Sequence, residues 1–203
     1  MTTTVKEPFR GYDMMVRLVG MRHATCWFDN YDVGDDAYAD LRQSALNKAR
    51  QYAIDLRDDP RSGANLILLG SCGTGKDHLA VSVLRAAISY KMSVRYIRGS
   101  VLCSECRQHT LETGRDVPRD TASVDLLVIS DIEPNANKNA TDFEERALLE
   151  LVDYRYTQML PTVITTNKKN RSELSTCIGE RTVDRLWQCG TRIVMNWGSY
   201  RKR

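Results

Sequence analysis

One short stretch of the sequence, Gly70-Ser-Cys-Gly-Thr-Gly-Lys76, constrains the fold of this chain more than any other. It follows an apolar run at 66–69 and precedes apolar residues at helical spacing that begin at Leu79. A GxxxxGK sequence between a strand and a helix is typical of a phosphate-binding loop. Its glycines let backbone N–H groups surround a phosphate, and the helix N-terminus and the lysine add positive charge. The alternative, a glycine turn that only joins a strand to a helix, is less favoured in this context.

We therefore predict a nucleotide site. The residues predicted to bind it are Gly70, Ser71, Cys72, Gly73, Thr74, Gly75, Lys76, Asp77 and His78.

Apolar runs and helical patterns alternate along most of the chain. Buried strands are predicted at 66–69, 94–97, 125–129, 161–166 and 191–196. Helices are predicted at 37–57, 79–88, 100–112, 142–159 and 180–187. Strands that alternate with helices favour an α/β fold, in which helices cover both faces of a parallel sheet.

The length of 203 residues fits one domain of ordinary size. Residues 1–20 are polar and irregular, which predicts a short N-terminal arm before a domain at 21–203. Residues 113–123 predict a polar loop.

The composition is that of a globular protein, with 42% hydrophobic residues, 27% charged residues and a net charge of +3. Because no apolar run approaches the roughly 20 residues that span a bilayer, we expect a cytosolic protein. A disulfide framework is not expected in such a chain. The lone CxxC pair, Cys103 and Cys106, is better explained as buried thiols on a helix than as a zinc site.

The residue after the lysine, Asp77, stands where a Ser or Thr usually holds Mg²⁺. The most convincing buried strand in the sequence, at 125–129, has the pattern of a Walker B strand, which delivers a carboxylate to the metal. Here Ser130 falls at the metal position and Asp131 at the position that polarises water. One hypothesis is an exchange in which Asp77, Ser130 and Asp131 supply the oxygen ligands of Mg²⁺. The alternative is a site that binds nucleotide and hydrolyses it slowly or not at all.

In a second register of the Walker B pattern on this strand, Asp131 is the metal ligand and Glu133 is the catalytic carboxylate. Pro134 argues against it, because proline interrupts a central strand.

Three further groups of polar residues are candidates for function. Asn167 follows the strand at 161–166, where it could touch the γ-phosphate or form an ordinary turn. Arg181 and Arg185 share a helix face, either as arginine fingers or in local salt bridges to Glu180 and Asp184. The basic side chains that are candidates for a nucleic-acid backbone, or for plain solvated surface, include Arg107, Lys168 and Lys169.

Five stretches in this order resemble the DnaC, DnaI and IstB family of AAA+ ATPases, which includes the bacterial replicative-helicase loaders. They are GSCGTGKDHLA, DLLVISDIE, TTN, IGERTVDRL and NWGSYRKR, and the resemblance covers about residues 20–203. It implies an AAA+ P-loop NTPase domain with a five-stranded parallel sheet flanked by helices. It also implies Mg²⁺ and ATP bound between subunits, assembly into a spiral, binding of single-stranded DNA, and a DnaB-like hexameric helicase as the partner.

The same resemblance implies roles for individual residues. Lys76 would be the Walker A lysine and Asn167 the sensor 1 residue. Arg185 would be the arginine finger, with Arg181 beside it, and Arg201 would stand at the sensor 2 position. Arg107 falls near the DNA-facing helix of this family.

Two departures from the family pattern matter. Ser130-Asp131 replaces the Asp-Glu of the Walker B strand, which puts hydrolysis in question. The residues before position 20 are also too few for the helicase-binding domain of the family, so we expect either a minimal helix in this arm or a different contact. A shortened loader of this kind would suit a bacterial phage or mobile element.

The expected function is that of a helicase loader in DNA replication. The alternatives are an adaptor or antagonist of the helicase that binds nucleotide without turnover, and an IstB-like helper of a transposase. A small-molecule kinase is least favoured, since the GERxxDRL stretch would go unexplained.

Overall fold

The structure is a computed structural model, and it describes residues 11–114, 117–134 and 139–200. Its centre is one parallel sheet of five strands in the order β2-β3-β4-β1-β5. Every predicted strand is confirmed to within two residues at each end. The strands are β1 (Asn65–Gly70), β2 (Val94–Arg98), β3 (Leu126–Ser130), β4 (Thr162–Thr166) and β5 (Gly190–Met195).

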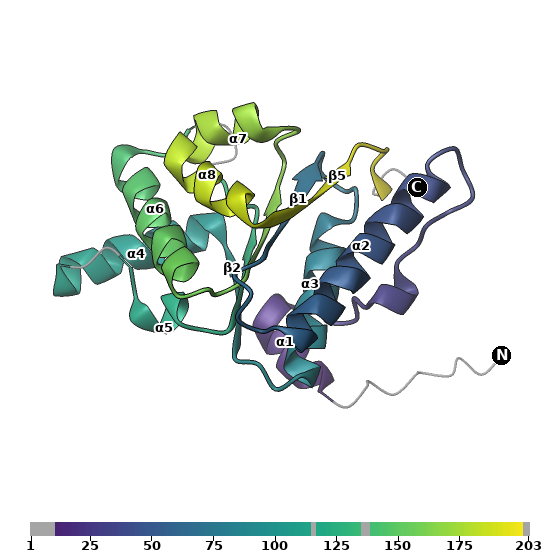
Figure 1. Ribbon diagram of the computed structural model, residues 1–203, viewed down its shortest axis with the longest axis horizontal. Coiled ribbons are helices and arrows are strands. Elements are labelled where there is room, and N and C mark those ends of the chain that lie inside the picture. Colours follow the sequence, from purple (N-terminus) through teal and green to yellow (C-terminus); the bar gives the residue numbers. More distant parts are fainter. Residues whose placement is uncertain (1–10, 115–116, 135–138, 201–203) are drawn as a thin grey trace.

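Helices cover both faces of this sheet (Figure 1). One face carries α1 (Tyr12–Val19), α2 (Ala39–Asp58) and α3 (Lys76–Ser89). The other carries α4 (Gly99–Thr113), the short α5 (Arg119–Ala122), α6 (Asp142–Thr157), α7 (Arg171–Ile178) and α8 (Glu180–Gln188). The expected α/β architecture is therefore confirmed.

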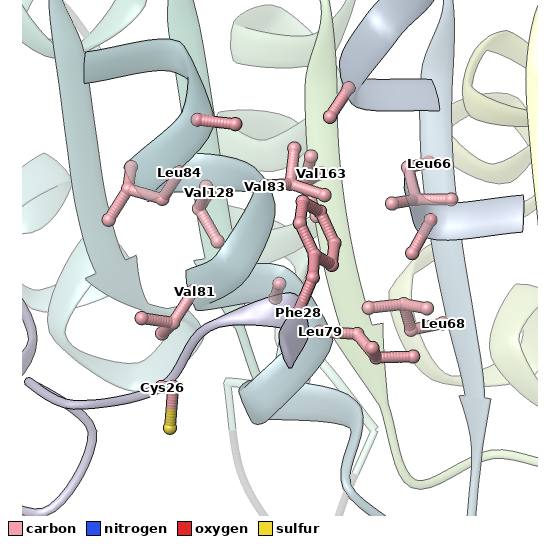
Figure 2. Packing of buried hydrophobic residues seen from close by; sticks show 14 of the residues in the cluster. Cys26, Phe28, Leu66, Leu68, Leu79, Val81, Val83, Leu84, Val128 and Val163 are labelled. Atoms are coloured by element: carbon pink, nitrogen blue, oxygen red, sulfur yellow. The ribbon is translucent and has the colours of Figure 1, made fainter. Parts of the chain in front are cut away.

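The alternation of side chains along the strands explains the two cores. In β1, Leu66 and Leu68 belong to the cluster under α2 and α3, whereas Ile67 and Leu69 belong to the opposite cluster. All six β1 residues are buried, as expected of a strand covered on both faces. The 3₁₀ helix η1 (Phe28–Asn30) adds Phe28 to the first cluster, near Leu79 of α3 (Figure 2).

The prediction of an irregular arm is wrong for residues 12–19, which form α1. Met15 and Val19 are four residues apart on one face of this helix, and both are buried in the cluster under α2 and α3. Gly11 and Gly20 flank the helix with positive φ angles. The rest of the predicted arm before Gly11 lies outside the described residues.

The predicted loop at 113–123 contains α5, and α7 was not predicted. Cys103 and Cys106 lie buried in α4, as expected of structural thiols. In the described part of the chain, every helix is too short or too polar to cross a bilayer.

Candidate nucleotide-binding site

The loop between β1 and α3 has the backbone that a phosphate-binding loop requires. Gly70, Gly73 and Gly75 all have positive φ angles, of 148°, 81° and 96°. A Cβ on Gly70 would lie 2.2 Å from the Met195 carbonyl oxygen, so only glycine fits beside β5. The α3 helix begins at Lys76, which places its N-terminus against the loop.

The Lys76 ammonium lies inside the loop. Its Nζ donates to the carbonyl oxygens of Gly70 and Ser71, each at 2.8 Å, and to Oδ1 of Asn167 at 3.1 Å. The residue is only 5% exposed, and this burial lowers the pKa of Lys76. Lys76 therefore joins the loop after β1 to the end of β4.

Asp77 and Ser130 are in direct contact. The Ser130 hydroxyl donates to Oδ1 of Asp77 at 2.9 Å, and the Thr165 hydroxyl donates to the same oxygen at 3.1 Å. The structure thus brings together the loop helix and the tips of β3 and β4 through one carboxylate. A carboxylate and a hydroxyl face each other here, as the exchange hypothesis expects.

Asp131 follows directly, where β3 has ended. Its φ of 45° turns the chain out of the strand. Its N–H donates to the Thr165 hydroxyl at 2.9 Å, and its Oδ1 accepts from Nδ2 of Asn167 at 3.1 Å. Burial, with the negative charges of Asp77 and Glu133 close by, raises the pKa of Asp131.

The side chain of Asn167 forms hydrogen bonds with three other residues at this edge of the sheet. Its Oδ1 accepts from Lys76 and from the Cys72 thiol, at 3.1 and 3.3 Å, while its Nδ2 donates to Asp131. One amide thus bridges the ammonium of the loop and the carboxylate after β3. The placement predicted for Asn167 beside the Walker B strand is confirmed.

Glu133 contacts the end of β4 through one carboxylate oxygen, and its role as the catalytic carboxylate stays a prediction. It is 7% exposed, and its Oε1 accepts from the Asn167 N–H at 2.9 Å and from the Thr166 hydroxyl. The carboxylate therefore fixes the end of β4 from inside the protein, where it positions Asn167. Sequence reasoning missed this role, for which a lone Glu before Pro134 gave no signal.

A cavity of about 300 Å³ adjoins the loop. It lies between the segment at 22–32, the start of α3, and Tyr200 near the end of the chain. The lining residues are Arg22, His23, Cys26, Asn30, Tyr31, Asp32, Gly73, Gly75, Lys76, Asp77, His78 and Tyr200. The cavity has room and aromatic walls for a base beside the phosphate loop.

His78 contributes to this cavity with one ring nitrogen already engaged. Its Nε2 donates to the Trp27 carbonyl oxygen at 2.8 Å, and burial lowers the pKa of the imidazole. Tyr31 and Tyr200 were not predicted as site residues, because two tyrosines 169 positions apart carry no local pattern.

Replacing Gly75 with alanine is expected to weaken nucleotide binding about tenfold or more. The new Cβ would lie 2.9 Å from Cε2 of Tyr31, at a φ of 96° that alanine rarely adopts. Gly114→Ala is the control, since its φ is 71° and nothing lies within 4 Å of the added Cβ. Titration with a fluorescent ATP analogue measures both variants, and equal affinities would contradict the expectation.

The two predicted finger arginines lie on α8, on the face of the sheet opposite α3. The Nε of Arg185 donates to Oδ1 of Asp153 at 2.9 Å, and its guanidinium lies 4.7 Å from the centre of the Tyr156 ring. Arg181 is exposed and has no ion pair among residues 11–114, 117–134 and 139–200. The structure does not bring either arginine to the loop of its own chain.

Arg181 and Arg185 do not form the salt bridges to Glu180 and Asp184 that were one of the two alternatives for them. Glu180 and Asp184 both pair with Arg171, at 2.9 and 3.1 Å, because Arg171 at the start of α7 reaches across to α8.

The predicted DNA-binding residues are spread over two elements. Arg107 of α4 lies 3.4 Å from Glu144 and over the ring of Phe143. Lys168 and Lys169 follow β4, and neither side chain forms an ion pair within the described part of the chain. Arg201 lies outside the described residues.

The residues present fit a nucleotide with a polyphosphate. The loop glycines, the buried Lys76 and the N-terminus of α3 are the groups that bind phosphates. Mg²⁺ prefers one or two carboxylates together with phosphate oxygens, and Asp77 with Ser130 offers hard oxygens beside Lys76. The described residues contain no cluster of three or more His, Cys, Asp or Glu side chains that could hold a metal by themselves.

Comparison with known proteins gives the same fold. The family model described as IstB-like ATP binding protein matches residues 8–203. The replicative helicase loader DnaC of Escherichia coli K12 is 31% identical over 190 residues, which span 89% of this chain and 71% of that protein. A crystal structure of the DnaC helicase loader superposes with a TM-score of 0.72 at 24% identity, over 86% of this chain and 98% of that one. The replication initiator DnaA bound to AMPPCP and single-stranded DNA gives a TM-score of 0.66 at 18% identity, over 83% of this chain and 49% of that one.

Proposed function

This chain belongs to the family of IstB-like ATP-binding proteins, and we propose that it is an ATP-controlled loader of a hexameric replicative helicase. One observation carries the proposal from the structure. Lys76, Asn167 and Asp131 form a continuous chain of contacts from the phosphate loop to the tips of β3 and β4. Such a network can transmit the state of the nucleotide to neighbouring surfaces. The identity with DnaC supports the helicase as the partner.

Each residue of the network would have a separate task. Lys76 and the loop amides would bind the phosphates of ATP, and the cavity beside Tyr31 and Tyr200 would take its base. ATP supplies a phosphoanhydride bond for hydrolysis, and Mg²⁺ neutralises the charge on its phosphates. Asn167 would sense the γ-phosphate, and Asp131 would orient the attacking water.

The metal ligands would be exchanged relative to the usual arrangement. The hydroxyl belongs to Ser130 on the strand and the carboxylate to Asp77 on the loop helix, 2.9 Å apart. The pair is the same as a Thr on the helix facing an Asp on the strand, with the two positions swapped.

Asp77→Ala is expected to weaken the Mg²⁺-dependent part of ATP binding by about tenfold, because it removes the only charged ligand of the proposed pair. The exchanged double variant, Asp77→Ser with Ser130→Asp, should recover most of the loss, whereas Ser130→Asp alone should not bind better than the wild type. Titrations of a fluorescent ATP analogue with Mg²⁺ and with EDTA measure this directly. If Asp77→Ala gains as much affinity from Mg²⁺ as the wild type, the exchange is wrong.

A second candidate function is an adaptor that binds ATP without turnover. The contacts of Glu133 favour it, because this carboxylate is buried and already accepts hydrogen bonds from Thr166 and Asn167, which leaves the shorter Asp131 to orient water. Steady-state ATP hydrolysis with and without single-stranded DNA separates the two. Turnover that responds to DNA supports a cycling loader, and its absence in protein that binds ATP supports the adaptor.

Binding of single-stranded DNA and self-association complete the proposal. Lys168 and Lys169 would contact the DNA backbone beside the nucleotide site, with Arg107 on α4 as a further contact. Arg181 and Arg185 would reach the nucleotide of a neighbouring copy, which suits their place on α8, away from the loop of their own chain. We place this activity in the bacterial cytoplasm.

A loading assay tests the proposed function. The protein is mixed with a DnaB-like helicase, ATP and a forked DNA whose single strand is covered by single-strand-binding protein, and unwinding is measured. The proposal expects unwinding to require both the protein and ATP, and Lys76→Ala to be inactive. Inhibition of a helicase that loads unaided would instead identify an antagonist, and stimulation of a transposase without any effect on the helicase would identify an IstB-like helper.

A further inference from the structure

The segment Asn196–Tyr200, which we name the C-terminal strap, lies beside the phosphate loop. The indole Nε1 of Trp197 donates to the Thr74 carbonyl oxygen at 2.9 Å. The backbone N–H of Tyr200 donates to the Gly73 carbonyl oxygen, also at 2.9 Å. Two consecutive carbonyl groups at the apex of the loop are thus held by donors that come from after β5.

These two hydrogen bonds fix the direction of the amide groups that follow. In a trans peptide the C=O and the N–H point in opposite directions. Since the Gly73 and Thr74 carbonyls point toward the strap, the N–H groups of Thr74 and Gly75 point away from it. Neither N–H donates to an acceptor among the residues that the structure describes. Both are therefore available to an anion in the loop.

The strap is itself held firmly. Trp197 is 4% exposed, and the Tyr200 hydroxyl donates to the Asp32 carbonyl oxygen at 2.5 Å. The Arg42 guanidinium lies 5.2 Å from the centre of the Tyr200 ring and pairs with Asp36 at 2.7 Å. The strap is thus anchored on α2 and on the segment after η1, independently of the loop.

A third contact reaches the same carbonyl from the other side of the cavity. The Tyr31 hydroxyl donates to the Thr74 carbonyl oxygen at 3.5 Å, and its ring packs edge-on against that of Tyr200, with centres 6.3 Å apart. Thr74 itself is fully buried, so its carbonyl depends on these partners.

We propose that the C-terminal strap orients the amides of Thr74 and Gly75 for the phosphates of the nucleotide, so that Trp197 and Tyr200 are positioning residues for nucleotide binding. The inference rests on the proposed nucleotide site and adds a part that the loop motif does not contain. In this chain the phosphate loop is completed by residues about 125 positions later in the sequence.

The first test removes the indole donor. Trp197→Phe keeps an aromatic ring and loses the N–H, while Trp187→Phe on α8 is the matched control. Affinities are measured for ATP, ADP and inorganic tripolyphosphate, the last of which has no base. We expect Trp197→Phe to weaken all three about tenfold and by the same factor, and Trp187→Phe to leave them unchanged.

The second test removes a backbone donor at a half-exposed position, where folding is less at risk. Tyr200→Ala and Tyr200→Pro both lose the ring and the hydroxyl, and only the proline variant loses the N–H. The proline variant should bind tripolyphosphate about tenfold more weakly than the alanine variant. Urea denaturation of the nucleotide-free proteins shows whether the two are equally stable.

The outcomes separate this inference from the function on which it rests. If the wild type binds tripolyphosphate, Lys76→Ala does not, and the strap variants match their controls, the strap has no such role. A loss for ATP and ADP without a loss for tripolyphosphate would also overturn the inference, since the strap would then serve only the base. If the wild type binds none of the three, the nucleotide site itself is wrong.

Discussion

Lys76→Ala is expected to weaken ATP binding by at least about 100-fold, because hydrogen bonds from a buried ammonium to phosphate oxygens contribute about 1.5–3 kcal/mol each. Lys76 is the buried cation of the loop, and it is held beside Asn167 at the end of β4. Its loss removes both the positive charge and the link between the loop and the tip of the strand. Isothermal titration calorimetry with Mg²⁺ and ATP measures the effect.

Lys48→Ala is the matched control, because Lys48 is an exposed lysine on α2. Its affinity for ATP should equal that of the wild type. Retention of more than about one tenth of the wild-type affinity by Lys76→Ala would show that the loop does not bind the phosphates through this lysine.

Arg155→Leu is expected to lower the free energy of unfolding by about 3–5 kcal/mol. Arg155 of α6 is 1% exposed, and each of its five N–H groups has an acceptor. The acceptors are the Thr162 hydroxyl and the carbonyl oxygens of Ala122, Val124, Asp125 and Pro161. Leucine would remove the donor that these oxygens share at the start of β3 and β4, and the Pro161 carbonyl would keep one partner, the Leu127 N–H at 3.5 Å.

Urea denaturation followed by tryptophan fluorescence measures this loss. Arg57→Leu is the control, since Arg57 is exposed on α2 and pairs with its neighbour Asp58. We expect the control to change the unfolding free energy by less than about 0.5 kcal/mol. Arg155→Lys tests the geometry, because lysine keeps a charge but cannot form the planar fork. Equal stability of the Arg155 and Arg57 variants would refute this account of α6.

Burial lowers the pKa of Arg155 to about 10, so the guanidinium remains charged at neutral pH. The folded pKa lies below the usual value for arginine. The loss of a proton from Arg155 therefore adds to the stability of the fold only as the pH rises above about 10. At neutral pH the hydrogen bonds of the charged guanidinium stabilise the protein.

The parts of the fold that follow a local pattern could be predicted from the sequence. The five strands are continuous apolar runs, because helices cover both faces of the sheet, and such runs are visible without a structure. The phosphate loop was predictable for the same reason, since its glycines and its lysine are consecutive. Asn167 could be placed because the carboxyl ends of neighbouring parallel strands lie at one edge of the sheet.

Other parts depend on contacts between distant residues and could not be predicted. Glu133 is followed by Pro134, and nothing nearby indicates that its carboxylate turns inward to Asn167. The contacts of Trp197 and Tyr200 with the loop join segments that only the order of the strands brings together, because β5 pairs with β1. The α1 helix was missed because its apolar pattern covers only eight residues and is interrupted by Arg17, so its buried residues Met15 and Val19 do not stand out from their exposed neighbours.

The measurement that tests the central claim most directly is the affinity for single-stranded DNA with and without ATP. Fluorescence anisotropy of a labelled oligonucleotide, at constant salt and Mg²⁺, gives both values for the wild type and for Lys76→Ala. A nucleotide-controlled loader is predicted to bind the oligonucleotide about tenfold more tightly with ATP, with no such gain in Lys76→Ala. Equal affinity with and without ATP, in protein that binds ATP, would contradict the account.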